Sequence, residues 1–185
     1  MAINLNIFQF IYNLNRFFPT NVPIGLFCGE YLIYILGIVI LLYLLLSKEP
    51  KQEKIKCLSI LILACCFSNV MVTPAIHYVY KSERPFLVMP EVGNYKNFLK
   101  VTEYTKSFPS GHTALAFALA MVLFLYNKKT GIGAFAVAFL VGLGRILMGV
   151  HWPLDVLGGI GVGILCGWIA YRLISRLFSK TTAIK

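Results

Sequence analysis

Residues 22–46 read VPIGLFCGEYLIYILGIVILLYLLL, and Glu30 is the only charged residue in this stretch. A helix of about 20 apolar residues crosses a hydrocarbon core of roughly 30 Å, so the stretch is long enough to span a membrane. The whole chain agrees, with 58% hydrophobic residues, 13% charged residues and a mean hydropathy of +0.77. Since soluble domains carry about 25% charged residues, we predict an integral membrane protein.

Four further apolar stretches follow, at residues 55–80, 110–126, 131–148 and 153–178. Residues 3–18 interleave apolar side chains with asparagines, which predicts an amphipathic helix at the membrane interface. Near the end of the chain, three glycines recur every four residues, a spacing typical of close helix packing in lipid (Gly159, Gly163 and Gly167). We expect an all-α integral membrane protein, a bundle of about five to six transmembrane helices, forming one domain over residues 1–185.

The basic residues favour one orientation of this bundle. The 17 lysines and arginines outnumber the 7 acidic residues and give a net charge of +10. With five spans, one side receives Lys48, Lys51, Lys54, Lys56, Lys128, Lys129, Arg172, Arg176, Lys180 and Lys185. The other side receives Arg16, Lys81, Arg84, Lys96, Lys100, Lys106 and Arg145. Because cytoplasmic loops carry an excess of basic residues, we predict that the first side is cytoplasmic. The bilayer and an anionic lipid, rather than nucleic acid, are the expected partners.

The motif PSGH at residues 109–112 stands directly before an apolar helix. Ser110 suits the N-cap position, where its side chain would accept a hydrogen bond from the helix start. The N–H groups of Gly111 and His112 would then point outward at the positive end of the helix dipole, an arrangement that binds phosphate. Capping alone does not account for His112, which places an ionisable group beside the bound oxygens.

A second polar motif pairs His151 with Asp155, and Pro153 between them favours the first turn of the last helix. A carboxylate one turn away can accept the imidazole N–H and leave the other ring nitrogen to act as a nucleophile. A His–Asp pair that only closes the end of a helix is the alternative on this motif alone.

Arg84 and Arg145 are predicted at the outer ends of the second and fourth spans, on the same side as both motifs. Ionisable residues at such depths are costly and mark functional sites. A guanidinium matches phosphate oxygens with a planar fork of donors. The site would combine two arginines, a helix N-terminus, two histidines and an aspartate. This combination suits phosphoryl transfer through a covalent intermediate. A transport or ion pathway lined by the same residues, and an inactive scaffold, are the non-enzymatic alternatives.

These motifs resemble those of the type 2 phosphatidic acid phosphatase superfamily. The family pattern is a lysine, six residues and Arg-Pro, then Pro-Ser-Gly-His, then Ser-Arg, five residues, His, three residues and Asp. The chain matches from Arg84 to Asp155, with two departures: His77 stands in place of the lysine, and Gly144 in place of the serine.

The resemblance implies roles for these residues and no metal or other cofactor. His151 is the expected nucleophile, Asp155 orients it, and His112 protonates the leaving oxygen. Arg84, Arg145, Ser110 and Gly111 are expected to hold the phosphoryl group. With the lysine replaced, His77 or Lys81, one turn away, is expected to contribute charge there.

Within the superfamily, the short chain, Glu30-Tyr31 and the stretch GVHWPLDVLG at residues 149–158 look most like bacterial undecaprenyl-diphosphate phosphatases. That resemblance implies hydrolysis of the terminal phosphate of a polyprenyl diphosphate at the outer face of the bacterial inner (cytoplasmic) membrane. Relatives that act on phosphatidylglycerol phosphate, phosphatidate or lipid A share the same motifs, and their substrates are the alternatives.

Overall fold

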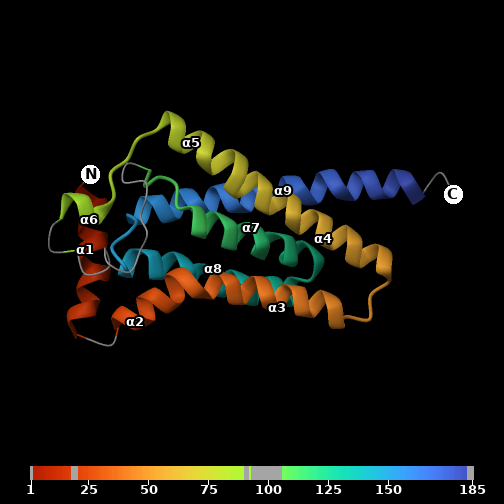
Figure 1. Ribbon diagram of the computed structural model, residues 1–185, viewed down its shortest axis with the longest axis horizontal. Helices are drawn as coiled ribbons and strands as arrows, with labels where there is room; N and C mark the ends of the chain where they lie inside the picture. The colour runs from red at the N-terminus through yellow and green to blue at the C-terminus, as the bar shows by residue number, and fades with distance from the viewer. Residues whose placement is uncertain (1, 18–20, 90–91, 93–105, 183–185) are drawn as a thin grey trace.

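The computed structural model describes residues 2–17, 21–89, 92 and 106–182, which are almost entirely helical (Figure 1). The elements in chain order are α1 (Ala2–Phe17), α2 (Asn21–Leu26), η1 (Phe27–Tyr31), α3 (Leu32–Leu46), α4 (Lys51–Cys65), η2 (Cys66–Val72), α5 (Thr73–Val79), α6 (Pro85–Val88), α7 (Gly111–Tyr126), α8 (Lys128–Leu147) and α9 (Pro153–Thr182). The π-helical turns η1 and η2 continue their flanking α-helices without a break, so residues 21–46 and 51–79 each form one long helix. The predicted all-α fold is confirmed.

Four helices in the described part of the chain are long and apolar enough to cross a membrane. They are Ile24–Leu46, Lys51–Val79, Lys128–Leu147 and Pro153–Ser179, and each lies within a few residues of a predicted span. The remaining predicted span, residues 110–126, forms α7, a shorter apolar helix of 16 residues. The chain is a multi-pass membrane protein.

α7 is the central helix of the bundle, and it packs mainly against α8 and α9 (Figure 1). Its contact with α9 is close because the three predicted packing glycines face it. A Cβ on any of them would lie within 2.7 Å of a carbonyl oxygen in α7 or at its N-cap (Gly159, Gly163 and Gly167, against Ser110, Ala114 and Ala118). The prediction that these glycines serve helix packing is confirmed.

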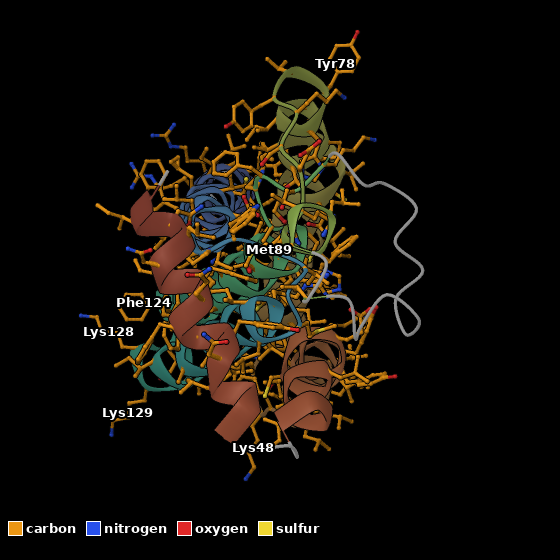
Figure 2. All side chains as sticks on the ribbon, turned by 90° about the vertical axis from the view of Figure 1, so that its left-hand side faces the viewer. Lys48, Tyr78, Met89, Phe124, Lys128 and Lys129 are labelled. Carbon is orange, nitrogen blue, oxygen red and sulfur yellow. The ribbon has the colours of Figure 1, made fainter. Side chains whose placement is uncertain are left out.

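The two ends of the bundle differ in character. α7 and α9 begin, and α8 ends, at the end where α1 and α6 lie, whereas the α3–α4 and α7–α8 turns lie at the opposite end (Figure 1). α1 crosses the first end, where its fully buried Phe8 packs against Trp152 with ring centroids 5.0 Å apart. At the tip of α5, Tyr78 projects away from the bundle (Figure 2). The α3–α4 and α7–α8 turns at the opposite end carry basic residues, namely Lys48, Lys51, Lys128 and Lys129. The fold therefore separates the polar motifs from this cluster of basic turns.

Candidate active site

The turn between α8 and α9 positions the histidine of the second motif. Gly149 adopts a φ of +70°, in the left-handed region that favours glycine, and a Cβ there would lie 2.1 Å from Cγ1 of Val92. The chain reverses at this point, and α9 begins at Pro153 as predicted. The turn therefore holds His151 at the end of the bundle, where only 2% of its surface is exposed.

The contact with Arg84 determines the tautomer of His151. Its Nη1 lies 3.3 Å from Nε2 of His151. Because a guanidinium can only donate, Nε2 presents its lone pair and the ring proton resides on Nδ1. Burial, and secondarily the charge of Arg84, hold the pKa of His151 well below its ordinary value of 6.5. At neutral pH the imidazole is therefore uncharged and nucleophilic.

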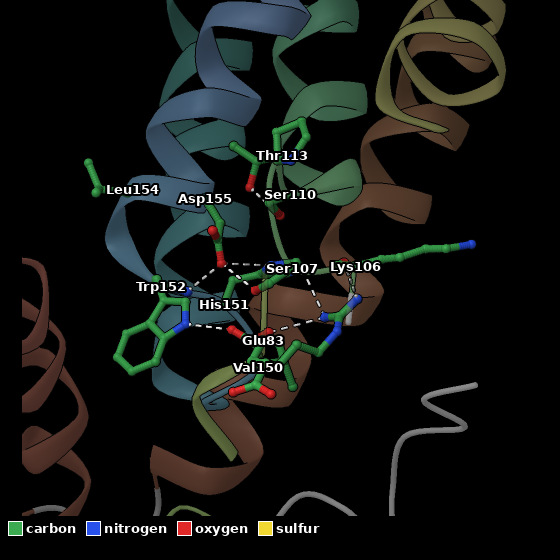
Figure 3. A network of polar contacts seen from close by, with 12 residues as sticks. Glu83, Lys106, Ser107, Ser110, Thr113, Val150, His151, Trp152, Leu154 and Asp155 are labelled. Carbon is green, nitrogen blue, oxygen red and sulfur yellow. Dashed lines mark hydrogen bonds and ion pairs between the residues drawn. The ribbon is translucent and has the colours of Figure 1, made fainter. Parts of the chain in front are cut away.

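Arg84 is itself anchored to the two loops that flank the site. Its Nη1 donates to the carbonyl oxygen of Val150 at 3.1 Å, and its Nη2 donates to that of Lys106 at 3.1 Å (Figure 3). These bonds fix the guanidinium against the main chain, so it does not depend on a bound anion for its position. The Lys106 side chain points away from the network in the same view.

Asp155 lies beside His151, as predicted, but the direct hydrogen bond is not formed. Its Oδ2 is 3.4 Å from Nδ1 of His151, and Nδ1 has no hydrogen-bond partner among the described residues. The same Oδ2 accepts from Ser107 Oγ at 2.5 Å and from the Trp152 N–H at 2.8 Å (Figure 3). These two donors fix the carboxylate beside the ring. Sequence reasoning gave Ser107 no role, because its partner lies 48 residues further along the chain.

The start of α7 carries the PSGH motif. Ser110 stands at the N-cap as predicted, but the expected side-chain cap is wrong: it makes no capping hydrogen bond. Its Oγ accepts instead from Thr113 Oγ1 at 3.0 Å, and its N–H donates to the carbonyl oxygen of Asp155 at 2.9 Å. Ser110 thus ties α7 to α9. Gly111 and His112 occupy the first turn, where N–H groups lack partners within the helix.

Arg145 of α8 is buried and contacts the first span. Its Nη1 donates to Glu30 Oε2 at 2.6 Å and to the Gly29 carbonyl oxygen at 3.2 Å. Its Nε is buried without a hydrogen-bond partner among the described residues. Such a donor is suited to an oxygen of a phosphoryl group. Sequence reasoning gave Glu30 no part in the site.

His77 and Lys81 lie at the edge of the site. His77 Nε2 is 3.0 Å from the carbonyl oxygen of Pro109, so the side chain contacts the main chain of the PSGH motif. Lys81 is exposed, and its Nζ donates to the His77 carbonyl oxygen at 3.2 Å. His77 therefore lies next to the PSGH motif, and Lys81 contacts His77 and not the motif itself.

Together these contacts form one cationic site. The charges of Arg84 and Arg145 both lower the pKa of His151, and Arg84 contacts its ring directly. Beside Asp155 opens a mainly apolar cavity of about 670 Å³, lined in part by Leu5, Tyr80, Phe108, Trp152 and Leu154. The cavity reaches from α1 to the start of α9. Lys96 and Lys100, which the topology prediction placed on this side, lie outside the described residues.

The chain is similar to known proteins in sequence and in fold. The model of the PAP2 superfamily matches residues 53–179. The bacitracin transport permease protein BcrC of Bacillus licheniformis is 32% identical over 95% of this chain and 82% of its own length. The undecaprenyl-diphosphatase BcrC of Bacillus subtilis is 29% identical over 95% of this chain and 86% of its own. The crystal structure of Aquifex aeolicus LpxE superposes with a TM-score of 0.64 at 30% identity, covering 93% of this chain and 96% of that one.

Proposed function

Since this chain belongs to the PAP2 superfamily, we propose that its site removes the terminal phosphate of a polyprenyl diphosphate through a phosphohistidine on His151. One observation carries the proposal: the unprotonated Nε2 of a buried, neutral His151 lies 3.3 Å from Arg84 Nη1. A guanidinium at that distance would bring a phosphoryl oxygen next to the nucleophile. The histidine is then already in its unprotonated, nucleophilic form.

In the first step, the Nε2 lone pair of His151 attacks the terminal phosphorus. The bond from phosphorus to the bridging oxygen breaks, and His112 gives a proton to that oxygen as the polyprenyl phosphate leaves. Arg84, the Nε of Arg145 and the N–H groups of Gly111 and His112 stabilise the charge on the transferring phosphoryl oxygens. Asp155, held by Ser107, stabilises the positive charge that develops on the imidazole.

In the second step, water attacks the phosphohistidine. His112, now neutral, takes a proton from the water, the phosphorus–nitrogen bond breaks, and His151 returns to its neutral form. Inorganic phosphate is the product. No redox change occurs, and every proton transfer uses a residue already in the site. His77 supports the phosphate loop through Pro109, in the position where the family pattern has lysine.

The choice of substrate rests on the relatives and on the cavity. The Bacillus subtilis relative that matches along nearly the whole chain is named an undecaprenyl-diphosphatase. The apolar cavity beside Asp155 would receive the part of a lipid tail nearest the head group, while the remainder stays in the bilayer. Following the basic-residue count, we place this site on the outer face of the bacterial inner membrane.

Release of inorganic phosphate by the purified protein in detergent tests this function. Farnesyl or undecaprenyl diphosphate, phosphatidate and phosphatidylglycerol phosphate are compared in the presence of EDTA, beside His151→Ala. Preference for the diphosphates, lost in the variant, is the expected result. Preference for a glycerolipid would keep the mechanism and replace the substrate, whereas no release from any of them would overturn the proposal.

A further inference from the structure

Glu30 is the one charged residue of the first span, and its carboxylate faces a guanidinium and an imidazole of the site. A single oxygen, Oε2, lies 2.6 Å from Nη1 of Arg145 and 3.7 Å from Nε2 of His112. These partners come from α8 and α7, so the first span joins the two helices that carry them. A carboxylate in an apolar span is costly, which indicates that its placement serves the site.

The fold brings Glu30 to this position through a contact between two glycines. A Cβ on Gly144 would lie 2.4 Å from the Gly29 nitrogen, and a Cβ on Gly29 would lie 2.9 Å from the Gly144 carbonyl carbon. The main chains of η1 and α8 therefore touch, one residue before Glu30 and one before Arg145. This close approach also accounts for Gly144, where the family pattern has a serine.

We propose that Glu30 is a positioning residue for the proton-transfer step and acts through His112. Its carboxylate stabilises the imidazolium form of His112, the form that gives a proton to the leaving oxygen. The relationship parallels that of Asp155 to His151: each histidine of the site has its own carboxylate, one from α9 and one from the first span. This inference rests on the function proposed above, and it adds a residue from outside the three motifs.

A purely structural role gives a different expectation. If Glu30 only neutralises the buried Arg145, its loss weakens phosphoryl binding to the same degree for every phosphate ester. If it acts through His112, its loss slows esters whose leaving group needs a proton and spares those whose leaving group departs as a stable anion. The dependence of the rate on the leaving group therefore separates the two roles.

The test compares kcat/KM for phenyl phosphate and p-nitrophenyl phosphate in wild type and Glu30→Gln. The value of kcat/KM depends only on the steps up to and including the first irreversible one. It therefore reports formation of the phosphohistidine and not its hydrolysis. General acid catalysis contributes roughly 10²–10⁴-fold, so we expect a loss of at least about tenfold for phenyl phosphate and a much smaller one for the nitrophenyl ester. Glu49→Gln, at the opposite end of the bundle, is the matched control. Equal losses for both esters, or no loss, overturn the inference.

A double-mutant cycle on farnesyl diphosphate provides the second measurement. Once His112 is replaced by glutamine, Glu30→Gln should cost little more, because the residue through which it acts is gone. Additive losses overturn the inference. Size-exclusion chromatography in detergent confirms that each variant is folded. The wild-type rates in the same assays test the proposed function separately. If the wild type is active and the losses in the variants are additive, only the role of Glu30 is overturned.

Discussion

Individual residues in the site are held in place by partners far away in the sequence. Asp155 illustrates this, since its Oδ2 accepts from Ser107, 48 residues earlier in the chain, as well as from the neighbouring Trp152 N–H. The motif residues could be predicted from the sequence because their chemistry is evident from residue type and spacing. Ser107 and Glu30 could not, because the role of a serine in the loop before α7 and of a glutamate in a span becomes evident only when the helices pack.

Replacing Ser107 with alanine should slow catalysis without preventing binding. The change removes a hydrogen bond to a charged group, worth about 1.5–3 kcal/mol, which corresponds to a loss of roughly 10–100-fold in kcat. KM should change little, because Ser107 is not expected to touch the phosphoryl group. Steady-state kinetics on farnesyl diphosphate check this, with Ser175→Ala as control, since that buried hydroxyl lies near the other end of α9. An unchanged kcat in Ser107→Ala would contradict the role given to Asp155.

The low pKa of His151 should determine how kcat/KM changes as the pH is lowered. Because the group is neutral until the pH falls well below 6.5, kcat/KM should not decline on its account as the pH is lowered through 6.5. Arg84→Gln removes a positive charge beside the ring, so the pKa of His151 should rise and the acid limb should move up toward pH 6.5. The pH dependence of kcat/KM in both proteins measures this. An acid limb that stays in place in Arg84→Gln would show that another group controls it.

At the scale of the helices, the sequence predicted where each helix begins and ends, but not which turns have π-helical instead of α-helical hydrogen bonds. The span boundaries follow from hydropathy, and the observed helices agree to within a few residues. The π-helical turns η1 and η2 were missed, because hydropathy does not distinguish a hydrogen bond to the fifth preceding residue from one to the fourth. η1 is the turn that contains Glu30. The π-helical turn and the site residue that the sequence did not predict therefore lie at the same place in the chain.

Packing between α7 and α9 gives a prediction about stability. Gly163→Ala should destabilise the protein by about 1–3 kcal/mol, because the added methyl group would lie 2.4 Å from the Ala114 carbonyl oxygen. Gly161→Ala on the same helix is the matched control, since nothing lies within 4 Å of its Cβ position. Thermal unfolding in detergent should show a lower midpoint for the first variant and no decrease for the second. Equal midpoints would mean that the helices separate more easily than the structure indicates.

At the scale of the whole molecule, all the site residues gather at one end and the cluster of basic turns lies at the other. The orientation of the bundle in the membrane can therefore be tested with two single cysteines, Lys129→Cys and Lys81→Cys, in a background without the five native cysteines. In intact cells, an impermeant maleimide should label position 81 and not position 129. Labelling at position 129 alone would reverse the orientation and place the site in the cytoplasm.

The central claim is that His151 carries the phosphoryl group, and trapping the intermediate tests it most directly. Wild-type protein is mixed briefly with farnesyl diphosphate labelled with ³²P in its terminal phosphate and then quenched in denaturant at alkaline pH. We expect a label on the protein that is stable to base, lost in acid, and absent from His151→Ala. A protein that releases phosphate yet never carries the label, or a label that persists in His151→Ala, would contradict the account.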